Sequence, residues 1–156
     1  AKGFALARDI PCTQIDALEA LAAGAYGFDG EICPILDARR DQVYCARFRF
    51  REGALPERVS EDMALKLTDF LDGLPADGRV LFTGDGVAAH GASVEHALGQ
   101  RALIAKPHLS GLRADAACYL AEMNPALRVP GENLEPIYLR KPQAERERAM
   151  RRGETA

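Results

Sequence analysis

Residues 42–51 divide between two faces at a spacing of two, with strict apolar–polar alternation over 46–51, a pattern typical of a strand with one face on a core. The preceding run, 31–38, is almost continuously apolar, and only a short charged turn separates the two. Such a turn forces antiparallel pairing, because a parallel partner needs a long crossover. The pattern predicts a hairpin over 31–51, with one face of its second strand partly exposed to solvent. Its core-facing residues are expected to be Tyr44, Ala46, Phe48 and Phe50.

Two helices are predicted where apolar residues recur at helical spacing behind a capping side chain. Asp16 follows a short strand-like run at 10–15 and caps the first helix, which we expect to end near Gly27. Ser60 caps the second helix, whose first turn carries two acids that suit the positive end of the helix dipole. The buried stripe of this second helix is expected to be Met63, Ala64, Leu67, Phe70, Leu71 and Leu74.

Two short apolar runs, at 79–83 and 101–105, have the length and composition of buried parallel strands. A tight turn and a weaker helix over 87–98 follow the first run, and a last helix begins at Ser110. That helix is expected to bury Leu112, Ala116, Ala117, Leu120 and Met123. The order of elements fits an α/β fold with a mixed sheet and flanking helices, as in one lobe of the ribonuclease H-like, actin-like ATPase superfamily.

Composition changes this picture little. The 156 residues suit one folded domain that needs no metal or disulfide to be stable, and the net charge of −3 argues against a general nucleic-acid binder. The four cysteines form no C-x-x-C pair, so we expect buried, reduced thiols. With no apolar run of about 18 residues and no signal sequence at the start, we expect a cytoplasmic protein without a membrane segment.

Several segments, taken in order, resemble one bacterial family. The run from Leu36 to Tyr44 is similar to the "D-A-R-x-G-E-V-Y" hairpin of the TsaB (YeaZ) family, although Asp41 stands where that family has glycine. The start of the chain resembles the family's "A-K-G-L-A-L-A" helix end, and Ile10 to Ala22 resembles its "I-P…S-L-E-A-L-A" segment. A "G-D-G" turn at 84–86 and a closing "P-x-Y-L-R" at 136–140 complete a resemblance that covers residues 1–142.

The resemblance implies an accessory, non-catalytic role without a cofactor of its own. TsaB-like proteins bind a TsaD-like transferase, which attaches threonylcarbamoyl to adenosine 37 of tRNA with help from a TsaE-like ATPase. The resemblance implies that the TsaD-like partner carries the catalytic metal and ATP. It also implies indirect contact with tRNA and a homodimer when the protein is free. The residues that the resemblance marks as partner contacts or fold markers are Asp37, Arg39, Arg40, Tyr44, Gly84, Asp85, Gly86, Tyr138 and Arg140.

The resemblance also predicts the domain organisation. Family members begin with a first lobe containing a "G-P-G-S-F-T-G-L-R" loop, which this chain lacks. We therefore expect residues 1–28 to be the remnant of a first-lobe helix, a strand and a connecting helix. Residues 29–142 should form the second actin-like lobe, and 143–156 a charged tail. Without the first lobe, apolar surface around residues 10–15 should be exposed and promote self-association.

One alternative is an enzyme of the same superfamily, either an M22-type peptidase or a nucleotide hydrolase. A metallopeptidase needs histidines that share a face, but His90 and His96 would point about 240° apart on a helix, so no metal site is expected. No G-x-S-x-G motif indicates a serine hydrolase. The turn at 84–86 could meet a phosphate through its backbone amides, or its glycines could simply permit a positive φ.

A second alternative is an interaction module that contacts RNA. Five arginines and one aspartate give residues 39–51 a local charge of +4, and such a face can approach phosphates. The same arginines could instead be the solvated side of an edge hairpin, where charge prevents aggregation. The candidates for RNA contact are Arg47, Arg49 and Arg51.

Overall fold

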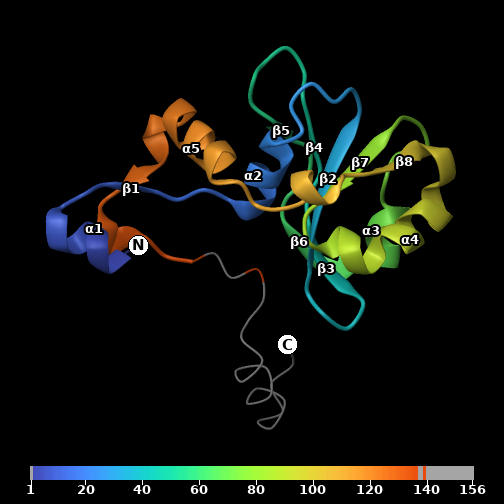
Figure 1. The fold of residues 1–156 in the computed structure, drawn as a ribbon, viewed down its shortest axis with the longest axis horizontal. Helices are drawn as coiled ribbons and strands as arrows, with labels where there is room; N and C mark the ends of the chain where they lie inside the picture. Colours follow the sequence, from blue (N-terminus) through green and yellow to red (C-terminus); the bar gives the residue numbers. More distant parts are fainter. Residues whose placement is uncertain (1, 137–138, 140–156) are drawn as a thin grey trace, which may run out of the picture.

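The computed structural model describes residues 2–136 and 139. Tyr138, Arg140 and the charged tail at 143–156 lie outside this part of the chain. No helix within it is both long and apolar enough to cross a bilayer. The described residues form a mixed sheet with helices on both faces, and a small module built from the two ends of this region lies beside it (Figure 1).

The central strand of the sheet is β2 (Glu31–Asp37). The strands β3 and β4 run antiparallel to it on one side, while β7 and then β8 run parallel to it on the other. The outer strands β6 and β5 pair with β3 and β4. The bounds of these partners are β3 Gln42–Cys45, β4 Phe48–Arg49, β5 Glu57–Arg58, β6 Met63–Lys66, β7 Val80–Thr83 and β8 Ala102–Ile104.

Each face of the sheet has its own core. The helices α3 and α4 cover one face, where Phe70 and Val94 pack with Phe82 of β7. The helix α2 covers the other face with Leu18 and packs against α5 (Figure 1). The helices are α1 Lys2–Arg8, α2 Ala17–Ala23, α3 Leu67–Asp72, α4 Gly86–Leu98 and α5 Ala114–Met123, with 3₁₀ turns η1 Gly99–Arg101, η2 Pro107–Leu109, η3 Pro125–Leu127 and η4 Gly131–Asn133.

The small module joins the beginning and the end of the described chain. Its strands β1 (Cys12–Thr13) and β9 (Arg128–Val129) pair antiparallel. The helix α1 packs on η4 so closely that a Cβ at Gly131 would lie 2.9 Å from the Cβ of Ala5.

The predicted strand at 10–15 is present only as the two residues of β1. The predicted first helix is capped by Asp16 as expected, but ends at Ala23 rather than near Gly27.

The predicted hairpin is confirmed, with one interruption. The pairs Ile35↔Cys45 and Ile32↔Phe48 share one register, so β3 and β4 act as a single antiparallel partner of β2. The gap between them lies opposite Pro34, which has no N–H to donate. The expected core face is confirmed by the buried Phe48. The other face is partly buried as well, because α3 and α4 cover Val43 and Cys45.

The prediction of a helix from Ser60 is wrong for its first half. Residues Met63–Lys66 form β6, which pairs with β3 along its whole length, and the helix α3 begins only at Leu67. Because β6 and β5 cover β3 and β4, the second hairpin strand is not a sheet edge. Ser60 accepts a hydrogen bond from the Arg47 backbone N–H at 3.0 Å instead of capping a helix. For residues 63–66, pairing with the free edge of β3 outweighs the helical spacing of their hydrophobic side chains.

The last helix begins later than predicted, at Ala114. The hydroxyl of Ser110 donates to the carbonyls of Ala105 and Lys106, both at 3.1 Å, and so closes the preceding loop rather than the helix. Leu120 is buried as expected. Leu112 and Met123 are 59% and 49% exposed, which corrects the expectation that they point inward.

The cysteines differ in accessibility. Cys33 and Cys45 are buried between the sheet and its helices, Cys12 is half-buried, and Cys118 is exposed, so the expectation of a buried thiol is wrong for Cys118. Burial raises the pKa of Cys45 to about 12 and places the pKa of Cys33 well above its usual range. Both buried thiols are therefore protonated and unreactive at neutral pH.

We expect iodoacetamide to alkylate Cys118 in the native protein and to leave Cys33 and Cys45 unmodified until the protein unfolds. Only the thiolate reacts, and burial suppresses both access and ionisation at the two strand cysteines. Peptide mass spectrometry at increasing urea concentration measures this directly. Modification of Cys33 before the global unfolding transition would contradict the packing described here.

Candidate functional site

The first candidate site lies where β2 and its parallel neighbour β7 end. The carboxyl ends of adjacent parallel strands meet at one edge, which is where α/β sheets commonly bind ligands. Asp37 ends β2, and the turn Gly84–Asp85–Gly86 leads from β7 into α4. The fold thus brings together four of the residues chosen from the sequence, Asp37, Gly84, Asp85 and Gly86.

The two carboxylates at this edge bind the backbone. Asp85 Oδ1 accepts from the Asp37 backbone N–H at 3.0 Å, and Asp37 Oδ1 accepts from the Arg39 N–H at 2.7 Å. His90 Nε2 on α4 lies 4.0 Å from Asp37 Oδ1. These contacts hold the hairpin turn against the start of α4. The arrangement stabilises this edge of the sheet, and both carboxylates already accept hydrogen bonds from backbone N–H groups.

The glycines of this turn are required by packing. Gly84 has φ of +102°, and a Cβ there would lie 2.2 Å from the carbonyl oxygen of Ile35. A Cβ at Gly86 would lie 2.9 Å from the same atom. The turn therefore passes directly over β2, and the "G-D-G" sequence has a structural explanation without a bound phosphate.

The hairpin turn explains the departure from the family pattern at Asp41. Arg39, Arg40 and Asp41 all have left-handed backbone, with φ of 61°, 55° and 58°. Aspartate tolerates this region better than most residues other than glycine. The Asp41 carbonyl accepts from the Leu67 N–H at 3.2 Å, which ties the turn to the start of α3. The turn thus keeps the geometry that glycine would permit.

Tyr44 belongs to a different site. It lies on the face of the sheet covered by α2 and lines a pocket of about 1060 Å³, together with Leu18 and Leu36. The helix α5 contributes Cys118, and the chain after η4 closes the pocket at Leu134–Pro136. Sequence reasoning did not find this pocket, because its walls come from segments about a hundred residues apart. The partner candidates Tyr138 and Arg140 lie outside the described residues.

A carboxylate pair lines one side of this pocket. Arg58 Nη2 lies 2.7 Å from Asp16 Oδ2, and the same guanidinium also pairs with Asp62 while lying 4.7 Å above the ring of Phe48. Burial acts to raise the pKa of Asp16, but hydrogen bonds from Asp62 and the α2 backbone outweigh it and lower that pKa. Burial and the contact with Asp16 raise the pKa of Asp62. The pKa of each acid thus depends on the other acid as well as on Arg58.

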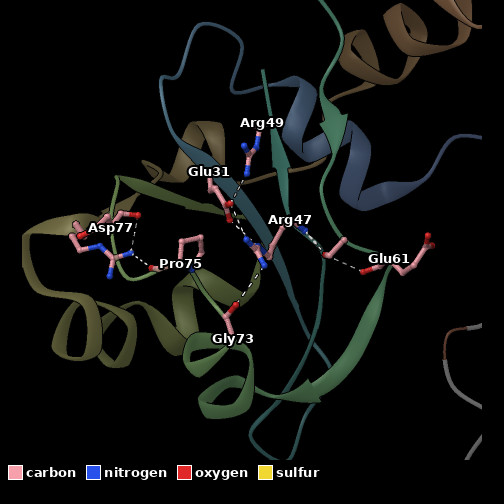
Figure 2. Close-up of polar contacts among 9 residues, drawn as sticks. Glu31, Arg47, Arg49, Glu61, Gly73, Pro75 and Asp77 are labelled. Carbon is pink, nitrogen blue, oxygen red and sulfur yellow. Dashed lines mark hydrogen bonds and ion pairs between the residues drawn. The ribbon is translucent and has the colours of Figure 1, made fainter. Parts of the chain in front are cut away.

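The arginines predicted to contact RNA are engaged within the protein. Arg47 holds Glu31 through two hydrogen bonds, Nε–Oε2 at 2.7 Å and Nη2–Oε1 at 2.8 Å, and also donates to the Gly73 carbonyl (Figure 2). Arg49 donates to Glu31 Oε1 at 3.0 Å. Arg51 pairs with Glu57 at 3.1 Å, and both are more than half exposed. RNA contact by these residues stays a prediction, with Arg51 the most accessible.

A neighbouring contact closes the loop between α3 and β7. Arg101 donates through Nε to the Gly78 carbonyl at 3.0 Å, and its Nη2 reaches the carbonyls of Pro75 and Asp77. Burial would raise the pKa of Glu31, but the hydrogen bonds and positive charges of Arg47 and Arg49 outweigh it and lower that pKa. This end of the sheet is therefore held by arginines on carboxylate and backbone oxygens.

The comparisons with known proteins agree along almost the whole chain. The family model described as TsaD, tRNA N6-adenosine threonylcarbamoyltransferase, matches residues 1–147. The tRNA threonylcarbamoyladenosine biosynthesis protein TsaB of Bacillus subtilis is 38% identical over 146 residues, which cover 93% of this chain and 62% of that protein. The chain thus spans less than two thirds of the length of this relative.

Solved structures confirm the fold. YeaZ from Pseudomonas aeruginosa superposes with a TM-score of 0.70 at 23% identity, over 88% of this chain and 64% of that one. A second structure, described as an uncharacterized protein from the same organism with similarity to peptidase YEAZ, gives 0.68 at 22% identity, over 89% and 63%. Together with the strand order, this similarity confirms the predicted α/β fold, a mixed sheet that contains the antiparallel hairpin and has flanking helices.

Proposed function

This chain belongs to the family that the TsaD model describes, and within it to the TsaB (YeaZ) proteins. On that premise we propose that it is an accessory subunit in the synthesis of threonylcarbamoyladenosine on tRNA. The observation that carries the proposal is the 38% identity to the B. subtilis protein, which extends over 93% of this chain. The family resemblance read from the sequence is thereby confirmed. The role in tRNA modification, the partners and the place of action in the cytoplasm are parts of the proposal.

The geometry of the candidate site supports an accessory role. Asp37 and Asp85 at the carboxyl edge of the sheet bind backbone N–H groups, as a brace would. Among residues 2–136 and 139, no group of three or more His, Cys, Asp or Glu side chains is arranged to hold a metal ion. We therefore propose that a TsaD-type transferase performs the chemistry, that a TsaE-type ATPase assists, and that tRNA is contacted through the transferase.

Exposed apolar side chains on the small module supply a surface for association. Phe4 and Leu6 on α1 are 64% and 52% exposed, and Ile10 is 40% exposed. Large apolar residues on a protein surface favour contact with another protein. We propose that the free protein forms a homodimer through this module. Light scattering that shows a monomer at micromolar concentration would contradict the homodimer.

Reconstitution tests the proposed function. The full-length protein, its cognate TsaD-type and TsaE-type subunits, tRNA, ATP and threonylcarbamoyl donor precursors are combined, and modified adenosine is measured by mass spectrometry of digested tRNA. We expect modification to fall at least tenfold when this protein is omitted and to return when it is added back. Equal modification with and without the protein would refute the accessory role.

A further inference from the structure

The pocket lined by Tyr44 has the size and the walls of a small-molecule site. Its volume of about 1060 Å³ is close to the upper end of the range for such pockets, about 300–1,000 Å³. Leu18 of α2, Leu36 of β2 and Ala117 of α5 supply apolar walls. The ring of Tyr44 on β3 adds an aromatic surface against which a flat ligand can stack. All four residues belong to regular elements, so the sheet and its helices hold these walls in place.

The polar end of the pocket is an acidic corner formed by Asp16, Glu19 and Asp62. Arg58 donates to Asp16 Oδ2 at 2.7 Å and also to Asp62 Oδ1, so these two acids share one guanidinium. Asp16 is held in place a second time, because its Oδ1 caps α2. Glu19 lies on the first turn of the same helix. The corner is therefore a preformed group of three acids and one base.

The negative charge of this corner is not fully compensated. Burial raises the pKa of Glu19 and of Asp62, and neighbouring acids add to both shifts, although Arg58 acts against them. Lys2 and Glu135, which also line the pocket, carry opposite charges that cancel. The three acids and Arg58 thus leave a net charge of −2. Because buried like charges disfavour ionisation, a further cation would stabilise the ionised acids.

From this match of shape and charge, we propose that the pocket between α2 and α5 binds a small organic cation. Its guanidinium or ammonium group lies at the acidic corner, and its apolar or aromatic body lies between Tyr44 and the wall of α5. A guanidinium suits this corner, since Arg58 already binds two carboxylates there through its two terminal nitrogens. The proposal concerns a ligand site and does not depend on the proposed accessory role.

Calorimetric titration of the full-length protein with 2-phenylethylguanidine tests the proposal. This probe joins a planar cation to an aromatic ring. Three further probes remove one property each: 2-phenylethanol is neutral, 3-phenylpropionate is an anion, and methylguanidine lacks the ring. We expect 2-phenylethylguanidine to bind at least about tenfold more tightly than each of them, the size expected for one charge-assisted hydrogen bond or one buried ring. No binding, or equal binding of the neutral probe, would overturn the proposal.

Variants at the two ends of the pocket locate the binding. Asp62→Asn removes one charge from the corner and should weaken 2-phenylethylguanidine at least about tenfold. Glu57→Gln changes the net charge equally, at an exposed pair outside the pocket, and should leave the affinity unchanged. Ala117→Phe fills the apolar wall and should also weaken binding. Cys33 that stays unmodified by iodoacetamide shows that each variant is folded. Wild-type affinity in both pocket variants would contradict the proposed site.

Cys118 gives an independent readout in the unaltered protein, because its exposed thiol lines the pocket. Saturating 2-phenylethylguanidine should slow alkylation of Cys118 by iodoacetamide at least about threefold, since the ligand covers the thiol. The same concentration of methylguanidine should leave the rate unchanged. Binding of 2-phenylethylguanidine without protection of Cys118 would place the cation on another acidic surface and overturn the inference.

Discussion

Replacing Gly84 by alanine should destabilise the protein by about 4 kcal/mol or more. The new Cβ would lie 2.2 Å from the carbonyl oxygen of Ile35, an atom of the central strand that cannot move without disturbing the sheet. The residue also has φ of +102°, which a side chain disfavours. Urea unfolding followed by circular dichroism measures the loss, and in a marginally stable domain it leaves a large unfolded fraction.

Gly78→Ala is the matched control, because Gly78 also has a positive φ, +90°, but nothing lies within 4 Å of a Cβ there. Its cost should be the backbone strain alone, about 1–2 kcal/mol. The difference between the two variants isolates the close approach of the "G-D-G" turn to β2. Equal losses would mean that conformation, and not packing, explains the glycine at 84.

Replacing Glu31 by glutamine should destabilise the protein by about 2 kcal/mol at pH 7. The change removes the negative charge that lies between the guanidinium groups of Arg47 and Arg49. The value is below that of a fully buried pair, because the side chains of Arg47 and Arg49 are 21% and 37% exposed. Urea unfolding at constant ionic strength measures it. Glu57→Gln, which breaks the exposed pair with Arg51, should change stability by less than about 0.5 kcal/mol.

The effect of Glu31→Gln should depend on pH in a defined direction. The folded-state pKa of Glu31 is lowered, so its ion pairs contribute fully above the unfolded value of about 4.3 and are lost as the pH falls through the folded value. The stability difference between wild type and variant should therefore be constant above about pH 5 and shrink below about pH 4. A difference that stays constant down to pH 3 would exclude ion pairing as its source.

The elements that could be predicted are those whose signal is local. The hairpin over 31–51 follows from alternation and a short turn, and the buried runs that became β7 and β8 follow from their length and apolar character. The helix cap at Asp16 can also be predicted from the sequence. Its side chain accepts from the N–H groups of Leu18 and Glu19, which are only two and three residues away. Each of these features depends on neighbours along the chain.

The errors occurred where a distant partner decides. Residues 63–66 carry a pattern that suits a helix, yet they form β6 because β3 offers a free row of backbone groups. Ser60 has the sequence context of a cap but accepts from Arg47, thirteen residues away. The arginines at 47 and 49 read as a free basic face, until folding brings Glu31 between them.

The sequence by itself determined the family, the order of most elements and the hairpin, since motif order and hydrophobic period are written along the chain. Only the tertiary structure decided which carboxylates bind backbone N–H groups and which arginines pair with an acid. It also decided that Asp16 and Asp62 line the same pocket. The reason is physical. Charge pairing and pocket shape depend on distances of a few ångströms between segments that lie tens of residues apart, and only packing of the whole sheet sets those distances.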